Sequence, residues 1–331
     1  MSDTQLPLFS ENHENSKSVS SKSEKSLQDP EWLLGLLNLN GIGSKKALKI
    51  VKHFETYEKL SEASDLEIQK VIGKNSVDFG GLEKIDSTAP DDVKILTYFD
   101  PAYPPGLRDL PDAPLLLWYR GIIPENKSLA IVGTRNADDW GRTTTRLFAK
   151  MCGDHDFAVI SGLALGIDTE AHLGCLESST PTVAILACDV RQPTPKSNSK
   201  LAEVILEKGG CLIAEVPPGS ETESFALVAR NRLQAAWAQG LIVTQCGVPS
   251  GTLHTVRFAM ELGRKLVVLE PPKDAQGSQY EGNIGLTQDY RFDSRILGGS
   301  NGFQNSVRTR PRGADITINS VSKFEDFLKN A

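Results

Sequence analysis

The sequence predicts an α/β protein with a doubly wound, mostly parallel sheet, preceded by a small all-helical region. Between residues 128 and 269, short apolar runs alternate with stretches of helical period. This alternation implies βαβ crossovers, with helices on both faces of the sheet. Three of the apolar runs also end in small hydroxyl and glycine residues before a helical pattern. Turns of this kind, at the carboxyl ends of parallel strands, are typical of open α/β sheets that bind ligands.

The N-terminal part is expected to contain a tail, a helical domain and a linker. Residues 1–28 are rich in Ser, Lys, Glu and Asn and poor in large apolar side chains, which predicts a disordered tail. The helical domain is expected over 29–75, because Asp29 is a good N-cap residue before proline and an apolar stripe follows. Residues 76–92 are expected to form the linker.

A glycine turn interrupts this helical domain. Asn40-Gly41-Ile42-Gly43-Ser44 ends the first stripe, and a second helical pattern follows it. Two helices joined by a Gly-Ile-Gly turn resemble the helix-hairpin-helix module, whose turn presents backbone N–H groups to a DNA phosphate. Lys45 and Lys46 would then be auxiliary DNA contacts. The alternative is a turn that only packs the two helices.

The main domain is expected over residues 93–331. A strand is predicted near 93–99, and the proline-rich segment that follows it, up to Gly121, allows little regular structure and should wrap onto the sheet. Strands are then expected over 129–132, 157–160, 182–187, 211–216, 241–246 and 265–269. Helices are expected near 141–152, 167–177, 199–208, 226–238, 252–263 and 321–328.

The three turns are candidate phosphate sites. They are Gly133-Thr134-Arg135, the segment from Ser161-Gly162 to Gly166, and Ser250-Gly251-Thr252. Glycine lets the backbone approach a ligand, hydroxyls add donors, and the following helix supplies unpaired N–H groups. Arg135 could also clamp a phosphate with its guanidinium, unless it pairs with Asp138 or Asp139 instead.

Further charged residues accompany the turns. Arg230-Asn231-Arg232 places two guanidinium groups in an otherwise apolar helical stretch, where burial is costly unless the charges are paired. One arginine could pair with Glu215 while the other faces nucleic acid. Asp168 is expected to cap a helix, and His172 to pack on a helix rather than act as a base. Trp140 and Phe225 either stack on bases or belong to the core.

Composition narrows the function classes. The chain of 331 residues has a net charge of −6, which argues against coating nucleic acid through bulk charge but leaves room for a basic groove. No apolar run approaches the length of a membrane span, so a cytoplasmic protein is expected. Five scattered cysteines predict free, buried thiols and no metal site. With no nucleophile elbow and no Walker lysine, neither an enzyme nor a cofactor is predicted.

Taken in order, these motifs resemble the DNA-processing protein A family (DprA/Smf) between about 95 and 272. The likeness is carried by Ile131 to Arg135, Val159 to His172, Asn198 with Leu201, Glu215-Val216-Pro217, Ala229 to Arg232, Ser250 to Thr252 and Glu261 to Arg264. It implies a Rossmann-like domain that binds single-stranded DNA and loads a RecA-type recombinase in natural transformation. The family commonly dimerises. Arg135 would be its phosphate-binding arginine, and Lys200 matches a DNA-contacting lysine of some members.

The sequence departs from that family in several places. Cys188-Asp189 stands where glycine is common, and Gln192 to Pro195 replaces a usual Tyr-Pro, which leaves one pocket wall in doubt. No C-terminal winged-helix domain is recognised. An unusual insertion spans about 274–312, and its arginines could contact phosphates or lie in a solvated loop. These are Arg291, Arg295, Arg308, Arg310 and Arg312.

Two other functions remain open at this stage. The first is a nucleotide sensor or a nucleoside monophosphate hydrolase, for which a paired Arg and Glu would be expected. The second is a recombinase adaptor that acts mainly through protein contacts. The combination of three turns with basic residues and no catalytic constellation favours one groove that holds successive phosphates of a single strand.

Overall fold

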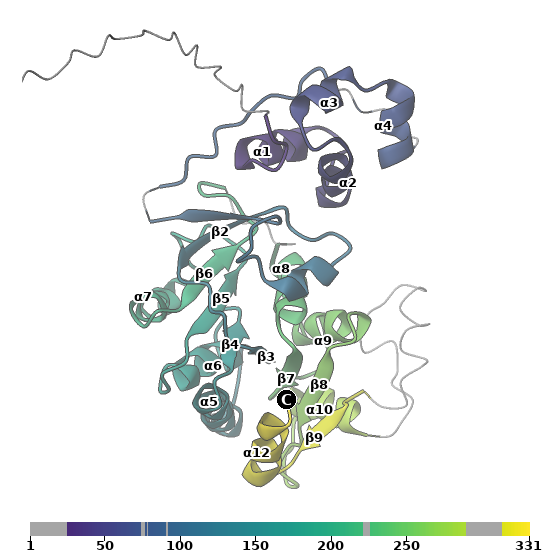
Figure 1. Ribbon diagram of the computed structural model, residues 1–331. Coiled ribbons are helices and arrows are strands. Elements are labelled where there is room, and N and C mark those ends of the chain that lie inside the picture. The colour runs from purple at the N-terminus through teal and green to yellow at the C-terminus, as the bar shows by residue number, and fades with distance from the viewer. Residues whose placement is uncertain (1–24, 74–76, 78, 91, 221–225, 289–312) are drawn as a thin grey trace, which may run out of the picture.

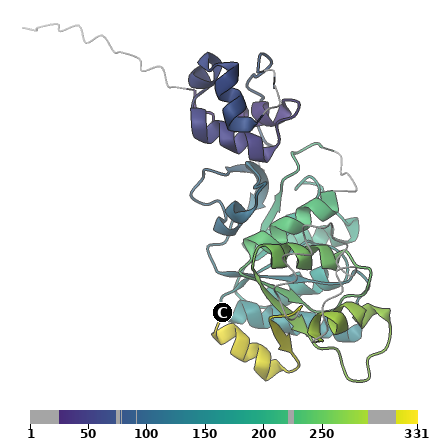
Figure 2. The ribbon, with the colours of Figure 1, turned by 90° about the vertical axis from the view of Figure 1, so that its right-hand side faces the viewer.

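The computed structural model describes residues 25–73, 77, 79–90, 92–220, 226–288 and 313–331 (Figure 1). Within these residues the strands form one nine-stranded sheet in the order β1-β2-β6-β5-β4-β3-β7-β8-β9. Helices cover both of its faces, and a helical region lies beyond the edge formed by β1 and β2 in both ribbon views (Figures 1 and 2). The predicted fold class is confirmed.

The helical region consists of four short helices. They are α1 (Pro30–Asn38), α2 (Ser44–Phe54), α3 (Tyr57–Glu62) and α4 (Asp65–Ile72). The Thr56 hydroxyl accepts the Lys59 N–H at the start of α3, and the Ser64 hydroxyl accepts the Glu67 N–H at the start of α4. Leu27 was expected in a disordered tail, but it is fully buried and donates its N–H to the Glu55 carbonyl. The ordered region therefore begins before Asp29.

Two antiparallel strands join this region to the sheet. They are β1 (Lys94–Thr97) and β2 (Leu116–Gly121), and β2 also pairs antiparallel with β6. The expectation of little regular structure up to Gly121 was therefore wrong for β2. The prolines precede the strand, and the short 3-10 helix η1 (Pro105–Asp109) lies among them. Leu116 and Trp118 share an apolar cluster with Trp32 and Leu36 of α1, which packs the helical region on the sheet edge.

The remaining strands are parallel. They are β3 (Ser128–Val132), β4 (Ala158–Ser161), β5 (Thr182–Leu186), β6 (Cys211–Ala214), β7 (Gly240–Val243), β8 (Lys265–Leu269) and β9 (Ile316–Ile318). The chain builds outward from β3 to β6, then returns to the other side of β3 for β7, β8 and β9. β3 is therefore the strand at which the order reverses, and the crevice beside such a strand is where doubly wound sheets bind ligands.

Alternation along the strands separates two cores. Leu129 and Ile131 of β3 pack with α5, α6 and α12, while Ala130 and Val132 pack with α8 and α9 on the opposite face. Phe148 of α5 stacks on Phe324 of α12 with 4.2 Å between ring centroids. The helices are α5 (Asp139–Asp154), α6 (Ile167–Cys175), α7 (Ser199–Glu207), α8 (Ala226–Trp237), α9 (Thr252–Glu261), α10 (Glu281–Thr287) and α12 (Val321–Lys329).

The predicted insertion is partly a structural element. Its first part forms η3 (Ser278–Tyr280) and α10, where buried Asn283 accepts the Cys246 N–H and donates to the carbonyls of Thr244 and Leu269. This segment therefore belongs to the sheet domain. The five insertion arginines lie outside the described residues.

Other predictions from composition can be compared with the described residues. All five cysteines are free and buried, as predicted. In the segments that the structure describes, no helix is long and apolar enough to cross a membrane, and no cluster of His, Cys, Asp and Glu is arranged to hold a metal ion.

Candidate functional site

The structure brings the three predicted turns together at the carboxyl edge of β3, β4 and β7. The Thr134 N–H of the first turn donates to the Gln245 carbonyl after β7, at 2.7 Å. The Thr134 carbonyl accepts the Ile167 N–H from the start of α6, at 3.1 Å. The first turn is therefore held between the segment that follows β7 and the start of α6, at the strand where the sheet order reverses.

Gly166 makes this close approach possible. Its φ is +75°, a conformation that L side chains rarely adopt, and a Cβ there would lie 2.4 Å from the Thr134 carbonyl oxygen. The second turn can therefore lie against the first only with glycine at this position.

Residues from all three turns and from α8 line one cavity of about 480 Å³. Its predicted lining residues are Gly133, Thr134, Arg135, Arg230, Asn231, Ser250, Gly251 and Thr252. The second turn contributes Ala164 rather than its glycines, and Asp168 also lines the cavity. The size is within the usual range of small-molecule and cofactor sites.

Two further hollows adjoin this cavity. The middle one, of about 230 Å³, shares Arg135, Ala164, Leu227 and Arg230 with it. A third, of about 480 Å³, shares Thr194 with the middle one and is lined by Lys200 at the start of α7. We call the three together the turn groove. Lys200 thus lies at the far end of the groove rather than beside the turns.

Arg230 supplies a buried cation to two of these hollows. Its side chain packs directly on Gly162, where a Cβ would lie 1.9 Å from its Nη1, and it donates to the Ile185 carbonyl. The residue is only 6% exposed, and its Nε has no hydrogen-bond partner among the described residues. Burial lowers the pKa of Arg230, yet a guanidinium stays charged in proteins. A desolvated cation whose donors are only partly satisfied is stabilised by a bound anion.

Asp168 holds the second turn rather than capping α6. Its carboxylate accepts the N–H groups of Gly162 and Ala164, at 3.2 and 3.3 Å. Burial raises the pKa of Asp168, while the charge of Arg230 acts in the opposite direction. The Asp168 carboxylate was predicted to accept N–H groups at the start of α6. It does accept N–H groups, but they belong to the turn before the helix.

Ser161 was predicted to contact the ligand, but its hydroxyl is buried. It donates to the Ile131 carbonyl at 2.7 Å, so it joins β4 to β3 and does not line the turn groove. The strand-end position of Ser161 made it look like a turn donor in the sequence. Its side chain points into the core because successive strand residues alternate between faces.

The two arginines of the Arg-Asn-Arg motif have different environments. Arg232 lies 3.0 Å from Asp112 and 2.9 Å from Glu215, as measured from its Nε and Nη2 to their carboxylate oxygens. Burial raises the pKa of Glu215, and the Arg232 charge opposes that shift. Arg232 does not line the cavity, so Arg230 is the one that faces the groove.

Arg135 is exposed and, within the part of the chain that the structure describes, forms no ion pair. The alternative pairing with Asp138 is not formed. The Asp138 carboxylate instead accepts the Gly141 N–H at 2.8 Å and the Tyr280 hydroxyl. Trp140 lies against Tyr280 with 5.8 Å between ring centroids, and Phe225 lies outside the described residues.

The two lysines of the helical region lie on α2, away from the turn groove. Lys45 is exposed, whereas the Lys46 ammonium donates to the Gly41 carbonyl at 2.8 Å and so closes its own turn. Neither residue lines any of the three hollows.

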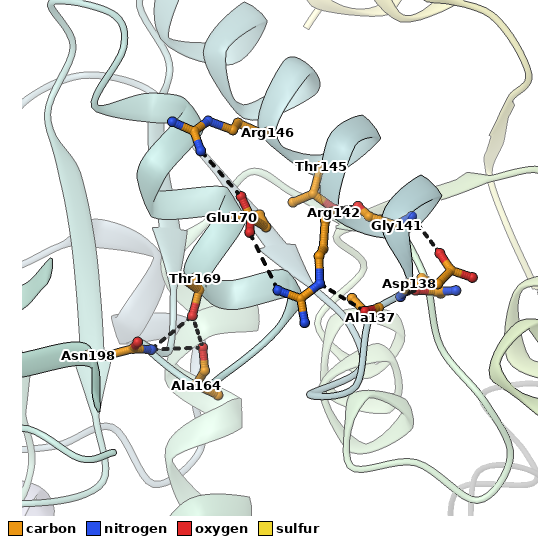
Figure 3. A network of polar contacts seen from close by, with 11 residues as sticks. Ala137, Asp138, Gly141, Arg142, Thr145, Arg146, Ala164, Thr169, Glu170 and Asn198 are labelled. Carbon is orange, nitrogen blue, oxygen red and sulfur yellow. Dashed lines mark hydrogen bonds and ion pairs between the residues drawn. The ribbon is translucent and has the colours of Figure 1, made fainter. Parts of the chain in front are cut away.

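A polar network includes residues of α5, α6, the second turn and Asn198 (Figure 3). Arg142 of α5 donates to the Ala137 carbonyl at 2.9 Å and lies 4.0 Å from Glu170 of α6. Asn198 donates to the Leu163 carbonyl at 2.8 Å and to the Thr169 hydroxyl at 2.9 Å. The sequence marked Asn198 only as part of a motif. Its contacts show that it fixes the second turn, which no local pattern could indicate.

His172 is buried beneath the second turn. Its Nδ1 lies 2.8 Å from the Thr182 hydroxyl, and Nε2 has no partner among the described residues. Burial lowers the pKa of His172 to about 3, with the Arg230 charge acting in the same direction. The imidazole is therefore neutral at physiological pH, and its packing on α6 agrees with the prediction from sequence.

A larger cavity lies elsewhere among the described residues. It measures about 840 Å³ and opens at the amino ends of β3 and β7, near Ser128 and Gln239. Arg264 at its wall is already bonded to the carbonyls of Gly106 and Ala236 and to the Asp109 carboxylate. The smaller turn groove is therefore the better candidate, because it contains Arg230, a buried cation whose Nε has no hydrogen-bond partner among the described residues.

Comparison with known proteins supports this fold and places the chain in a family. The family described as "DNA recombination-mediator protein A" matches residues 94–290, and a "SAM-like Helix-hairpin-helix tandem" matches 33–78. The chain belongs to the DNA recombination-mediator protein A family. The family match includes all three turns and the Arg-Asn-Arg motif of α8.

Individual relatives agree with the assignment. Protein Smf of Synechocystis is 31% identical over 264 residues, which cover 74% of this chain and 65% of that protein. The putative DNA processing protein DprA of Mycobacterium tuberculosis is 36% identical over 172 residues, covering 50% of this chain and 43% of that one. This chain therefore spans about two thirds or less of the length of these two relatives.

Two solved structures share the fold. DNA processing protein A from Streptococcus pneumoniae superposes with a TM-score of 0.64 at 24% identity, covering 88% of this chain and 95% of that one. The Helicobacter pylori protein, whose structure is described in terms of a single-stranded DNA binding mode, gives 0.52 at 22% identity, covering 66% and 94%.

Proposed function

We propose that the protein binds single-stranded DNA along the turn groove. The observation that carries the proposal is that two arginines line the same two hollows. Arg230 is buried, with an Nε that has no hydrogen-bond partner among the described residues, and Arg135 is exposed. Backbone and hydroxyl groups of Thr134, Ser250 and Thr252 lie beside them. The family to which the chain belongs, and the DNA-binding mode named for the Helicobacter pylori relative, both support this ligand.

A polymer fits this arrangement better than a single nucleotide. The groove continues from the first cavity through the middle hollow to Lys200, so its basic groups are spread over several adjoining hollows. The charge of Arg135 also acts to lower the pKa of Arg230, as expected for two cations that face each other. A chain of phosphates would neutralise both cations and release bound counterions.

We assign no bond-making step to the groove. Ser161 and His172 are buried and hydrogen-bonded to the Ile131 carbonyl and the Thr182 hydroxyl, so neither offers a nucleophile or a base to the groove. The protein would instead act as a recombination mediator. It would protect incoming single strands and load a RecA-type recombinase in natural transformation, inside the cell and as a homodimer, as its family membership suggests.

A mononucleotide sensor or hydrolase is the second candidate. The cavity of about 480 Å³ is large enough for one nucleotide, and Arg232 does pair with Glu215. However, neither member of that pair lines the cavity, so the arrangement does not suit attack on a glycosidic bond.

The proposal is tested by fluorescence anisotropy with oligo-dT and with duplex DNA. We expect Arg135→Ala to weaken oligo-dT binding by about tenfold or more, and to reduce the dependence of log K on log salt by about 1. Lys265→Ala is the control, because Lys265 is an exposed cation at the start of β8 that lines none of the three hollows.

Equal affinity of Arg135→Ala and the unaltered protein for oligo-dT would contradict the proposed groove. Thermal stabilisation by a mononucleotide, without DNA binding, would favour the sensor. Recombinase capture that survives both nuclease treatment and Arg135→Ala would favour a protein adaptor.

A further inference from the structure

Asp138 is a carboxylate that could neutralise the exposed arginine of the first turn. It follows Arg135 by three positions, and its side chain caps α5 by accepting the Gly141 N–H at 2.8 Å (Figure 3). A guanidinium and a carboxylate so close in the chain readily form an ion pair. Such a pair would engage the cation that the turn groove offers to a phosphate, so the partners of Asp138 affect the groove.

A tyrosine from a distant segment occupies this carboxylate. The Gly141 N–H donates to Oδ1 of Asp138, and the Tyr280 hydroxyl donates to Oδ2. Each carboxylate oxygen therefore has an uncharged donor. Burial acts to raise the pKa of Asp138, but hydrogen bonds from Tyr280, Gly141 and two glutamine side chains outweigh it and lower that pKa. Asp138 is therefore ionised at physiological pH and would attract a nearby guanidinium.

The Tyr280 side chain is held firmly by its surroundings. Tyr280 ends η3 and is only 6% exposed, and its ring packs against Trp140 of α5 with 5.8 Å between ring centroids. The helix α10 follows at once, and there Asn283 accepts the Cys246 N–H at 2.7 Å, which fixes the segment to the end of β7. The hydroxyl therefore has a fixed position relative to the start of α5.

This position lies outside the groove. Arg135 lines two of the three hollows, whereas neither Asp138 nor Tyr280 lines any of them. The hydrogen bond thus keeps the carboxylate with η3, while the guanidinium two peptide units upstream of Ala137 faces the groove.

We propose that Tyr280 is a positioning residue: its hydroxyl holds the Asp138 carboxylate away from Arg135 and so keeps that guanidinium available for a phosphate of single-stranded DNA. The proposal rests on single-stranded DNA binding in the turn groove. It accounts for an exposed arginine that stays unpaired, among the described residues, beside an acidic side chain. It also gives the segment after β8 a part in binding, although this segment lines none of the three hollows.

Fluorescence anisotropy of the full chain with oligo-dT tests the proposal. Tyr280→Phe removes only the hydroxyl and keeps the ring contact with Trp140. Asp138 can then pair with Arg135, and we expect binding to weaken by about threefold, the size expected for competition from one exposed ion pair.

A charge-matched pair of second substitutions identifies the cause of that loss. Asp138→Asn, added to Tyr280→Phe, should restore the affinity of the unaltered protein, because asparagine still caps a helix but carries no charge. Asp139→Asn is the matched control, since Asp139 is an exposed carboxylate at the next position. It removes the same charge and should leave the loss in place.

A second measurement separates this role from general support of the fold. In an Arg135→Ala background, Tyr280→Phe should weaken binding no further, because no guanidinium remains to be paired. An additional loss there, or a failure of Asp138→Asn to restore binding, would mean that Tyr280 only supports the first turn. Unchanged affinity in Tyr280→Phe would mean that the hydroxyl is dispensable.

These results overturn the positioning role and leave single-stranded DNA binding intact. The proposed function fails separately, if Arg135→Ala alone binds oligo-dT as tightly as the unaltered protein.

Discussion

The second turn of the sheet domain and the turn between α1 and α2 have similar local sequences but different surroundings. Each contains a glycine with positive φ, +75° for Gly166 and +81° for Gly41, and each leads into a helix. A Cβ on Gly166 would lie 2.4 Å from the Thr134 carbonyl oxygen, whereas a Cβ on Gly41 would meet nothing within 4 Å. The Gly166 turn packs inside the sheet domain, whereas the Gly41 turn lies on the surface.

The cations beside the two turns differ in the same way. Lys46 satisfies the carbonyl of its own turn, while Arg230 is buried over Gly162 with its Nε unpartnered among the described residues. A buried cation held in place by packing has already lost its hydration before an anion arrives. The glycine pattern therefore marks a turn, whereas burial in the tertiary structure decides whether that turn is a strong anion site.

The largest expected contrast comes from replacing the two glycines. Gly166→Ala should lower the free energy of unfolding by about 3 kcal/mol or more, because it adds a backbone clash to an unfavourable φ. Gly41→Ala should lower it by about 1 kcal/mol, since only the φ cost applies. Urea denaturation measures both. Similar losses of unfolding free energy for the two variants would show that a Cβ meets no more steric hindrance at Gly166 than at Gly41.

A second contrast compares the buried His172 with the exposed His53. The folded-state pKa of His172 is lowered by burial to about 3, below the ordinary value of 6.5, so the unfolded chain binds its proton first as pH falls. The buried, neutral imidazole therefore costs no stability above pH 6.5, and the free energy of unfolding decreases as the pH falls from 6.5 toward 3. At pH 5 the loss from this group is about 2 kcal/mol.

Replacing His172 should therefore flatten the decline in stability between pH 7 and 5. His172→Asn removes the titrating group, and the exposed His53→Asn is the control. Asp168, whose pKa burial raises, contributes with the opposite sign at lower pH, which is why the window stops at pH 5. An unchanged slope in His172→Asn would contradict the buried, neutral imidazole.

The smallest expected effect concerns the helical region itself. The double variant Lys45→Ala, Lys46→Ala should weaken oligo-dT binding by less than about threefold, because both lysines are solvated and lie outside the turn groove. Anisotropy alongside Arg135→Ala measures the difference. A loss as large as that of Arg135→Ala would make the helix-hairpin-helix turn a principal DNA contact.

The prediction from sequence was strongest where the signal is local. Hydrophobic period identified the parallel strands from β3 to β8 and most helices, but not β9. The strand-turn-helix order also placed Gly133 to Arg135 and Ser250 to Thr252 at one sheet edge, where they line one cavity. It was wrong about β2, because proline content outweighed the apolar run after Pro114. It also assigned a ligand contact to Ser161, whose hydroxyl instead donates to the Ile131 carbonyl of β3.

By itself, the sequence determined the fold class, the order of the turns and the residue types that surround them, because these follow from spacing along one short stretch of chain. Only the tertiary structure decided which arginine of the Arg-Asn-Arg motif faces the groove. Arg232 is paired with Asp112, 120 positions away, and Arg230 packs on Gly162. It also decided that Leu165 lies in the groove. Burial and pairing depend on distant parts of the chain, which no local pattern encodes.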